Sequence, residues 1–221
     1  MIRAFAFDLD ETLADCEPQH RRATKAMLDA TGVDANKARD VFHDVTGRRT
    51  SDIIEAWRAA SGVTHSLDEL LSLRHSAFLA ALDEEPPQAM PGAIECLRAS
   101  AALGPVAVVT SGYREDALET LRAIGALPFL ATIVTGEDVA QPKPNPEPFI
   151  VAAGRLGVKP AEILVFEDSP RGVAAGLAAG CRVVAVPNAR STRPEAVVNA
   201  HVVLASLTQA LPLSMLFARM P

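Results

Sequence analysis

The sequence predicts an α/β fold in which a parallel sheet carries helices on both faces and is interrupted by an inserted all-helical segment. Five short apolar segments, rich in valine and isoleucine, alternate with helical stretches after residue 90; they span 106–110, 131–135, 162–168, 182–186 and 201–205. Strands that are apolar on both faces are typical of a parallel sheet buried between helices. Residues 16–87, by contrast, contain no convincing strand. These patterns predict a Rossmann-like core with an inserted all-α cap domain.

The first strand lies at the N-terminus, where Ile2 to Phe7 is short and apolar. It belongs with the later strands, so we expect a core domain built from residues 1–15 and 88–221. Residues 16–87 then form the helical cap domain, with helices over 17–30, around 51–60 and over 66–82. In the core, helices are expected over 114–124, from residue 146 onward and over 172–179.

Composition limits the classes of function. The chain has 221 residues, is 49% hydrophobic and carries a net charge of −6, which suits a folded acidic protein and argues against disorder or a nucleic-acid partner. No apolar run is long enough to span a membrane, and the N-terminal apolar run leads directly into Asp8, so we expect neither a membrane partner nor a signal peptide. Three widely spaced cysteines favour reduced thiols in a cytoplasmic protein.

Polar residues converge where the predicted strands end. All strands of a parallel sheet present their carboxyl ends at one edge, where ligands bind. The residues expected there are two aspartates after the first strand, a hydroxyl and glycine cluster, a loop lysine and an acidic pair: Asp8, Asp10, Thr110, Ser111, Gly112, Lys143, Glu167 and Asp168. Carboxylates suit Mg²⁺, whereas the lysine and hydroxyls suit phosphoryl oxygens. The pattern predicts a phosphate site built around a hard cation.

Each residue also has a structural explanation. Asp8 and Asp10 could form a solvated turn, and Thr110 or the acidic pair before Pro170 could cap the following helix. Lys143 could be an exposed loop lysine. The functional interpretation is favoured because independent strands deliver matching chemistry to the same edge.

Four motifs in this order resemble those of the haloacid dehalogenase superfamily. They are DxDxT at 8–12, a hydrophobic run ending in threonine at 107–110, KPxPxxF at 143–149 and FEDSxxG at 166–172. The helical insertion after the first motif resembles the small cap of the subfamily that contains β-phosphoglucomutase and the sugar-phosphate and phosphoglycolate phosphatases.

The resemblance implies a role for each motif residue. Asp8 would be the nucleophile that forms an aspartyl-phosphate, and Asp10 the general acid and base. Thr110 and Lys143 would bind the transferring phosphoryl group, and Lys143 would also keep Asp8 ionised.

The same resemblance implies a Mg²⁺ site made by Asp8, Asp168 and the main-chain carbonyl of Asp10, with support from Glu167. Asp10 argues against dehalogenase or phosphonate-cleaving activity, because those relatives lack an aspartate at this position. Glu11 is a departure, since most of this subfamily places glycine there.

Substrate choice is expected to depend on the cap. His20 could sense or protonate substrate, or lie on a helix surface. Arg48 or Arg49, in the loop 46–52, could contact a second anionic group or simply begin a helix, and Arg74 is a weaker candidate. Closure of the cap requires hinges, which are expected near residues 14–18 and 85–91.

The predicted function is a Mg²⁺-dependent phosphatase acting on a small phosphorylated metabolite, either a sugar phosphate or a phosphoglycolate-like compound. A β-phosphoglucomutase-type mutase would use the same residues, and a non-enzymatic binding protein is the second alternative. The protein is expected to be a monomer or a homodimer.

Overall fold

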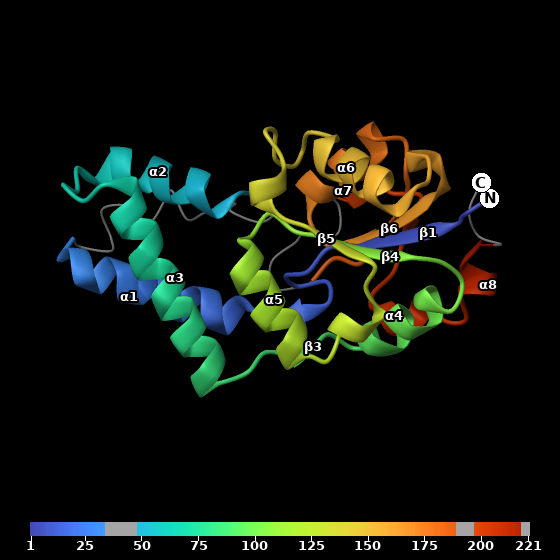
Figure 1. Ribbon diagram of the computed structural model, residues 1–221, viewed down its shortest axis with the longest axis horizontal. Helices are drawn as coiled ribbons and strands as arrows, with labels where there is room; N and C mark the ends of the chain where they lie inside the picture. The colour runs from blue at the N-terminus through green and yellow to red at the C-terminus, as the bar shows by residue number, and fades with distance from the viewer. Residues whose placement is uncertain (34–47, 189–196, 218–221) are drawn as a thin grey trace.

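The main sheet is fully parallel, as the sequence predicts. The computed structural model describes residues 1–33, 48–188 and 197–217. The strand order is β5-β4-β1-β6-β7-β8; Figure 1 labels β5, β4, β1 and β6 of this sheet. The strands are β1 (Ala4–Phe7), β4 (Val106–Val109), β5 (Thr132–Val134), β6 (Ile163–Glu167), β7 (Arg182–Ala185) and β8 (Val202–Val203). The order reverses at β1, which makes the carboxyl end of β1 the topological switch point of the sheet.

Alternating side chains of β1 separate two hydrophobic clusters. Phe5 and Phe7 pack against one layer of helices, whereas Ala4 and Ala6 face the other layer. The first layer contains α4 (Ala93–Ala101), α5 (Arg114–Ala123) and the short α8 (Leu213–Phe217). The second layer contains α6 (Glu147–Leu156) and α7 (Pro170–Ala178) (Figure 1). Both faces of the sheet are therefore buried, which confirms the predicted Rossmann-like α/β class.

Three helices lie at one end of the molecule, away from the sheet (Figure 1). They are α1 (Glu17–Thr31), α2 (Thr50–Ser61) and α3 (Leu67–Glu84), and we refer to them as the cap helices. α3 packs against both α1 and α2, and these helices bury a hydrophobic cluster of their own around Trp57. All three helices fall within residues 16–87, although the domain boundaries themselves stay a prediction.

Two very short strands pair where the chain passes between the core and the cap helices. β2 (Ala14–Asp15) is antiparallel to β3 (Gln88–Ala89), and Ala14 is opposite Ala89. Beside this pair, the Gln19 side-chain amide donates a hydrogen bond of 2.6 Å to the Glu85 carbonyl. The two crossing segments, which the sequence marks only as hinges, are thus tied to each other.

The other elements of the described residues are single 3₁₀ turns in the connections: η2 (Leu127–Phe129), η3 (Gly136–Asp138), η4 (Pro160–Glu162) and η6 (Leu207–Ala210). The sequence patterns predict no helix over 93–101, whereas the structure has α4 there. Within the described ranges, no helix combines the length and apolarity that crossing a membrane requires.

Candidate active site

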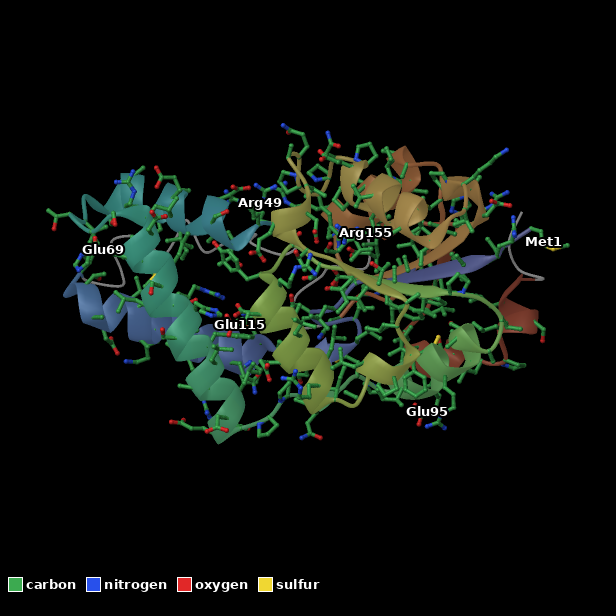
Figure 2. The ribbon with its side chains drawn as sticks, in the orientation of Figure 1. Met1, Arg49, Glu69, Glu95, Glu115 and Arg155 are labelled. Atoms are coloured by element: carbon green, nitrogen blue, oxygen red, sulfur yellow. The ribbon has the colours of Figure 1, made fainter. Side chains whose placement is uncertain are left out.

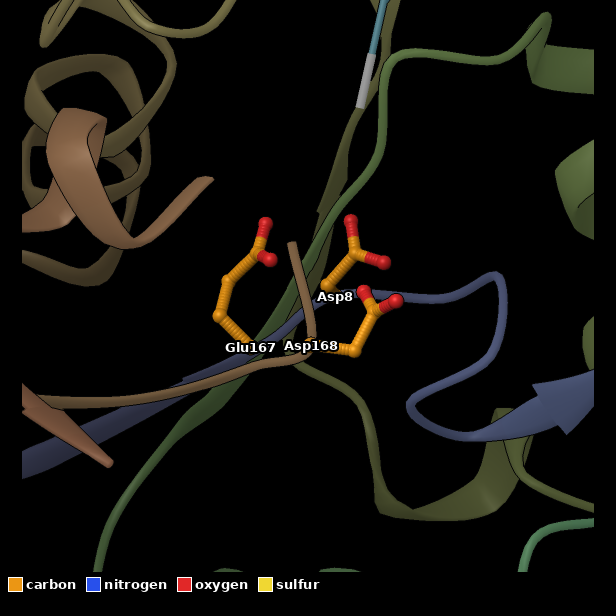
Figure 3. Close-up of side chains that lie close together, drawn as sticks. All are labelled: Asp8, Glu167 and Asp168. Carbon is orange, nitrogen blue, oxygen red and sulfur yellow. The ribbon is translucent and has the colours of Figure 1, made fainter. Parts of the chain in front are cut away.

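Three adjacent strands deliver the predicted motif residues to one edge of the sheet. Asp8 follows β1, Thr110 follows β4, and Glu167 and Asp168 lie at the end of β6. Because β1 lies between β4 and β6, these residues are neighbours in space although they are far apart in the sequence. Figure 3 shows the carboxylates of Asp8, Glu167 and Asp168 side by side above the strand ends.

Lys143 is the buried cation of this group. Its side-chain amine donates hydrogen bonds to Asp8 Oδ1 at 2.6 Å, to Glu167 Oε1 at 2.6 Å and to the Val109 carbonyl at 2.8 Å. These contacts use all three N–H groups of the ammonium. Lys143 therefore joins β1, β4 and β6 and is not an exposed loop lysine.

The pKa values of the cluster reflect burial and crowded charge. Burial raises the pKa of Asp8 to about 8, since it outweighs the opposing effect of the nearby Lys143 ammonium. Burial, followed by the neighbouring carboxylate of Glu167, also raises the pKa of Asp168. Burial alone would lower the pKa of Lys143, but the carboxylates of Asp8 and Glu167 raise it. The single ammonium of Lys143 thus lies near the carboxylates of Asp8, Glu167 and Asp168. A further positive charge among these carboxylates would favour their ionised forms.

The residues present fit a divalent cation. Oxygen atoms of Asp8, Glu167 and Asp168 lie within 4.8 Å of one another. Asp168 Oδ2 is buried, and no hydrogen-bond partner for it is found in the described part of the chain. An unsatisfied buried carboxylate oxygen is costly, and a bound Mg²⁺ would satisfy it.

Glu167 is held differently from the two aspartates. Its Oε1 accepts from Lys143, and its Oε2 accepts from both the Ser169 amide and the Ser169 hydroxyl, each at 2.9 Å. Both carboxylate oxygens of Glu167 thus already accept hydrogen bonds. This suits the role predicted for Glu167, support of the metal site, more than direct coordination of the metal. The roles predicted for these residues, including metal binding at the main chain of Asp10, stay predictions.

Asp10 contacts the cap helices through His20 of α1. Asp10 Oδ1 lies 3.1 Å from His20 Nε2, and His20 Nδ1 lies 2.9 Å from an Arg74 guanidinium nitrogen of α3. Because arginine can only donate, Nδ1 accepts, and the ring hydrogen lies on Nε2 and points at Asp10. Burial opposes ionisation of Asp10, but the combined effect of His20, Cys16 and Arg74 is larger and lowers the pKa of the carboxyl.

The threonine motif lies beside this contact. Thr110 Oγ1 is 3.5 Å from Asp10 Oδ2, and it accepts a hydrogen bond of 3.0 Å from the Gly112 amide. Ser111 and Gly112 line the same cavity as Asp8 and Asp10. The Gly112 amide is thus already used within the loop in this structure.

A cavity of about 700 Å³ lies between the edge of the sheet and the cap helices. Its core wall includes Asp8, Asp10 and Asp168, and its cap wall includes His20 and Arg74. Asp116 and Thr120 of α5 also line it. The sequence does not predict these two residues as part of the site. They belong to no motif, and a helical pattern alone does not show which side of α5 faces the cavity.

The two adjacent arginines of the loop 46–52 lie in different surroundings; residues 46 and 47 of this loop lie outside the described residues. Arg48 lines the main cavity. Arg49 donates to the Val139 carbonyl at 3.0 Å and lies beside the core loop that follows β5 (Figure 2). Arg49 lines a second cleft of about 580 Å³, which Arg48 also lines, and Arg49 does not line the main cavity; its predicted contact with substrate stays a prediction.

Comparison with known proteins agrees with this geometry. Residues 2–180 match the haloacid dehalogenase-like hydrolases. The chain belongs to this family. It is 34% identical to validoxylamine A 7'-phosphate phosphatase of Streptomyces hygroscopicus subsp. limoneus, over 95% of this chain and 96% of that protein. It is 35% identical to hexitol phosphatase A of Escherichia coli (strain K12), over 87% and 86% of the two chains. The family predicted from the four motifs is confirmed.

Solved structures show the same architecture. CbbY from Rhodobacter sphaeroides, crystallised with phosphate, superposes with a TM-score of 0.85 at 26% identity, covering 96% of this chain and 97% of that one. The similarity includes the cap helices as well as the core, because nearly all of both chains is covered.

Proposed function

We propose that the protein is a Mg²⁺-dependent phosphatase that hydrolyses a small phosphorylated metabolite through an aspartyl-phosphate on Asp8. The observation that carries this proposal is the buried contact of Lys143 with Asp8 and Glu167, with Asp10 on the adjoining turn beneath a cavity. This arrangement offers a carboxylate nucleophile, a cation beside it and a second carboxylate for proton transfer.

The chemistry divides between the two aspartates. Asp8 would attack phosphorus while the ester oxygen–phosphorus bond breaks, and protonated Asp10 would give its proton to the departing alcohol. Asp10, now ionised, would take a proton from the water that attacks phosphorus, so that phosphate leaves and Asp8 is regenerated. The contact with His20 lowers the pKa of Asp10, so it favours the ionised form that the second step requires and opposes the protonated form that the first step requires.

Asp8, Asp168 and the main-chain carbonyl of Asp10 would hold the metal, with Glu167 orienting Lys143 beside them. Bound Mg²⁺ would neutralise negative charge on the transferring phosphoryl group. Lys143 and Thr110 would contact its other oxygens.

We propose a sugar or polyol phosphate as the substrate in preference to phosphoglycolate. A cavity of about 700 Å³ is large for a two-carbon acid. Two relatives of this chain are named as phosphatases of larger phosphate esters, a hexitol phosphate and validoxylamine A 7'-phosphate.

Release of inorganic phosphate tests the proposal. Hexitol phosphates, hexose phosphates and phosphoglycolate would be incubated with the enzyme and Mg²⁺, with chelated metal and Asp8→Asn as controls. We expect the highest kcat/KM on a hexose or hexitol phosphate, and loss of turnover in both controls. No turnover of any ester, or turnover that survives Asp8→Asn, would contradict the proposal.

The same assay separates the mutase alternative. With β-glucose 1-phosphate, a phosphatase releases phosphate in proportion to the substrate consumed. Conversion to glucose 6-phosphate without equivalent phosphate would identify a mutase.

A further inference from the structure

Glu11 has an unusual backbone conformation beside the active site. Its φ of 62° makes it the one non-glycine residue with positive φ in the part of the chain described here. Residues with a Cβ disfavour this left-handed region, which glycine adopts freely. The conformation belongs to a tight turn, in which the Glu11 amide donates to the Ala14 carbonyl at 2.8 Å. Glycine would suit the backbone at this position, so the contribution of glutamate must come from its side chain.

The Glu11 carboxylate is buried and contacts two other segments. Oε1 accepts a hydrogen bond of 3.2 Å from the amide of Glu17, the first residue of α1. Oε2 accepts a hydrogen bond from the side-chain amide of Asn188, which follows β7 and is also buried. One side chain thus joins the turn after β1, the first cap helix and the segment after β7.

The contact with Glu17 supplies the missing cap of α1. The first amides of a helix have no partner within the helix, and the N-cap residue, Cys16, provides no side-chain acceptor. A carboxylate at this end also interacts favourably with the helix dipole. The cap of this helix therefore comes from the core turn and not from the helix itself.

The start of α1 in turn orients His20. His20 lies in the first turn of α1, and its ring contacts Asp10, the residue that directly precedes Glu11. The turn and the helix are therefore joined twice, through Glu11 to Glu17 and through Asp10 to His20. The first turn of α1 therefore sets where the His20 backbone lies relative to Asp10, while two residues of α3 hold its ring: Phe78 stacks on it with ring centroids 4.7 Å apart, and Arg74 donates to Nδ1.

We infer that Glu11 is a positioning residue that holds the first turn of α1 against the catalytic turn and thereby aligns His20 with Asp10. Its kinetic consequence rests on the proposed phosphatase function, whereas its structural consequence does not. Glu11→Gly removes the carboxylate but permits the backbone conformation. Glu11→Gln keeps a carbonyl acceptor for Glu17, and the Asn188 amide can turn to present its oxygen to the new side chain.

Nuclear magnetic resonance and kinetics test the inference together. In Glu11→Gly we expect about tenfold faster hydrogen exchange of the Glu17 amide, in keeping with loss of a charge-assisted hydrogen bond, and displaced ring signals of His20. With an ester that the enzyme hydrolyses, kcat should fall by roughly 3- to 10-fold, the size typical of one lost hydrogen bond. Glu11→Gln should restore most of each property, and Glu95→Gln, an exposed change on α4, should match the wild type.

Unchanged Glu17 exchange, unchanged His20 signals or unchanged kcat in Glu11→Gly would overturn the inference. It would also be overturned if Glu11→Gln were as impaired as Glu11→Gly. If the wild type hydrolysed no ester, the proposed function would fail, while the exchange rate and ring signals would still decide the role of Glu11.

Discussion

Gly172 of α7 leaves room for the Glu167 carboxylate that holds Lys143. A Cβ built at Gly172 would lie 1.6 Å from Glu167 Oε1, the same oxygen that accepts from Lys143. Glu167 cannot easily turn away, because its other oxygen is bound to Ser169. The absence of a side chain at residue 172 is therefore a requirement of the site.

Gly172→Ala should lower the free energy of unfolding by about 1–3 kcal/mol through overpacking, and lower kcat/KM at least roughly tenfold because Lys143 loses its position. Denaturant unfolding and steady-state kinetics measure the two effects. Gly154→Ala is the matched control: this glycine lies inside α6 with no atom within 4 Å of a built Cβ. It should stabilise the protein by about 0.5–1 kcal/mol and leave kinetics unchanged. Equal effects of the two substitutions would contradict the account.

The individual site residues that could be predicted from the sequence are polar residues that follow the predicted strands. Asp8, Thr110 and Asp168 could be found because the end of a parallel strand is also the edge of the sheet, whereas Lys143 could be found only as part of the loop that follows β5. The precise partners could not: nothing in a lysine between prolines shows that it contacts Glu167 as well as Asp8. The surroundings of Arg49 depend on how the cap helices lie on the core, which one sequence does not determine.

Among the elements, the connection that contains η3 is held by Asp138. Its carboxylate accepts hydrogen bonds from the Thr135 amide at 2.8 Å and from Arg155 of α6 at 2.7 Å. The carboxylate also forms an ion pair with Arg114 of α5. Figure 2 labels Arg155. Although partial burial opposes ionisation, these donors lower the pKa of Asp138 below its ordinary value. Asp138 thus joins α5, the end of β5 and α6.

Asp138→Asn should lower the free energy of unfolding by about 1–3 kcal/mol at pH 7. Since the pKa in the folded state lies below that of the unfolded chain, this stabilisation is present above about pH 4 and is lost as the pH falls further. Urea unfolding of both proteins between pH 7 and pH 3 should show the difference shrinking. Asp83→Asn, at an exposed residue of α3, should behave as the wild type throughout. A difference that stayed constant with pH would contradict this assignment.

The longer elements were predictable because the strands are continuous apolar runs and the helices repeat a helical period. β1, β4, β6 and α5 extend over enough residues for apolar runs or helical spacing to be visible. β2 and β3 have two residues each, and their pairing joins positions more than seventy residues apart. No local pattern carries that information, so the hinges were expected but their pairing was not.

Across the whole molecule, the cap helices contact the core through His75 of α3. Its Nδ1 lies 2.6 Å from Asp116 Oδ1, and its Nε2 lies 3.0 Å from Glu115 Oε2, both on α5. Burial raises the pKa of Asp116, although His75 opposes this effect. The contact joins α3 to α5, and its partner Asp116 lines the cavity.

A double-mutant cycle of His75→Ala and Asp116→Asn should give a coupling of about 0.5–3 kcal/mol in kcat/KM, because both changes release the same contact between cap and core. The control cycle uses Glu55 and Arg58, an ion pair within α2. Its coupling in kcat/KM should be within about 0.5 kcal/mol of zero. If the losses of kcat/KM in His75→Ala and Asp116→Asn were simply additive, the contact between these residues would not govern closure of the cap helices over the core.

In the proposed mechanism, Asp8 carries the phosphoryl group during turnover. Acid quenching of the enzyme mixed with Mg²⁺ and its best phosphate ester, followed by mass spectrometry of the digest, measures this directly. We expect a phosphoryl group on the peptide that contains Asp8 in the wild type, and none in Asp8→Asn. A phosphoryl group on another residue, or rapid phosphate release by Asp8→Asn, would contradict this mechanism.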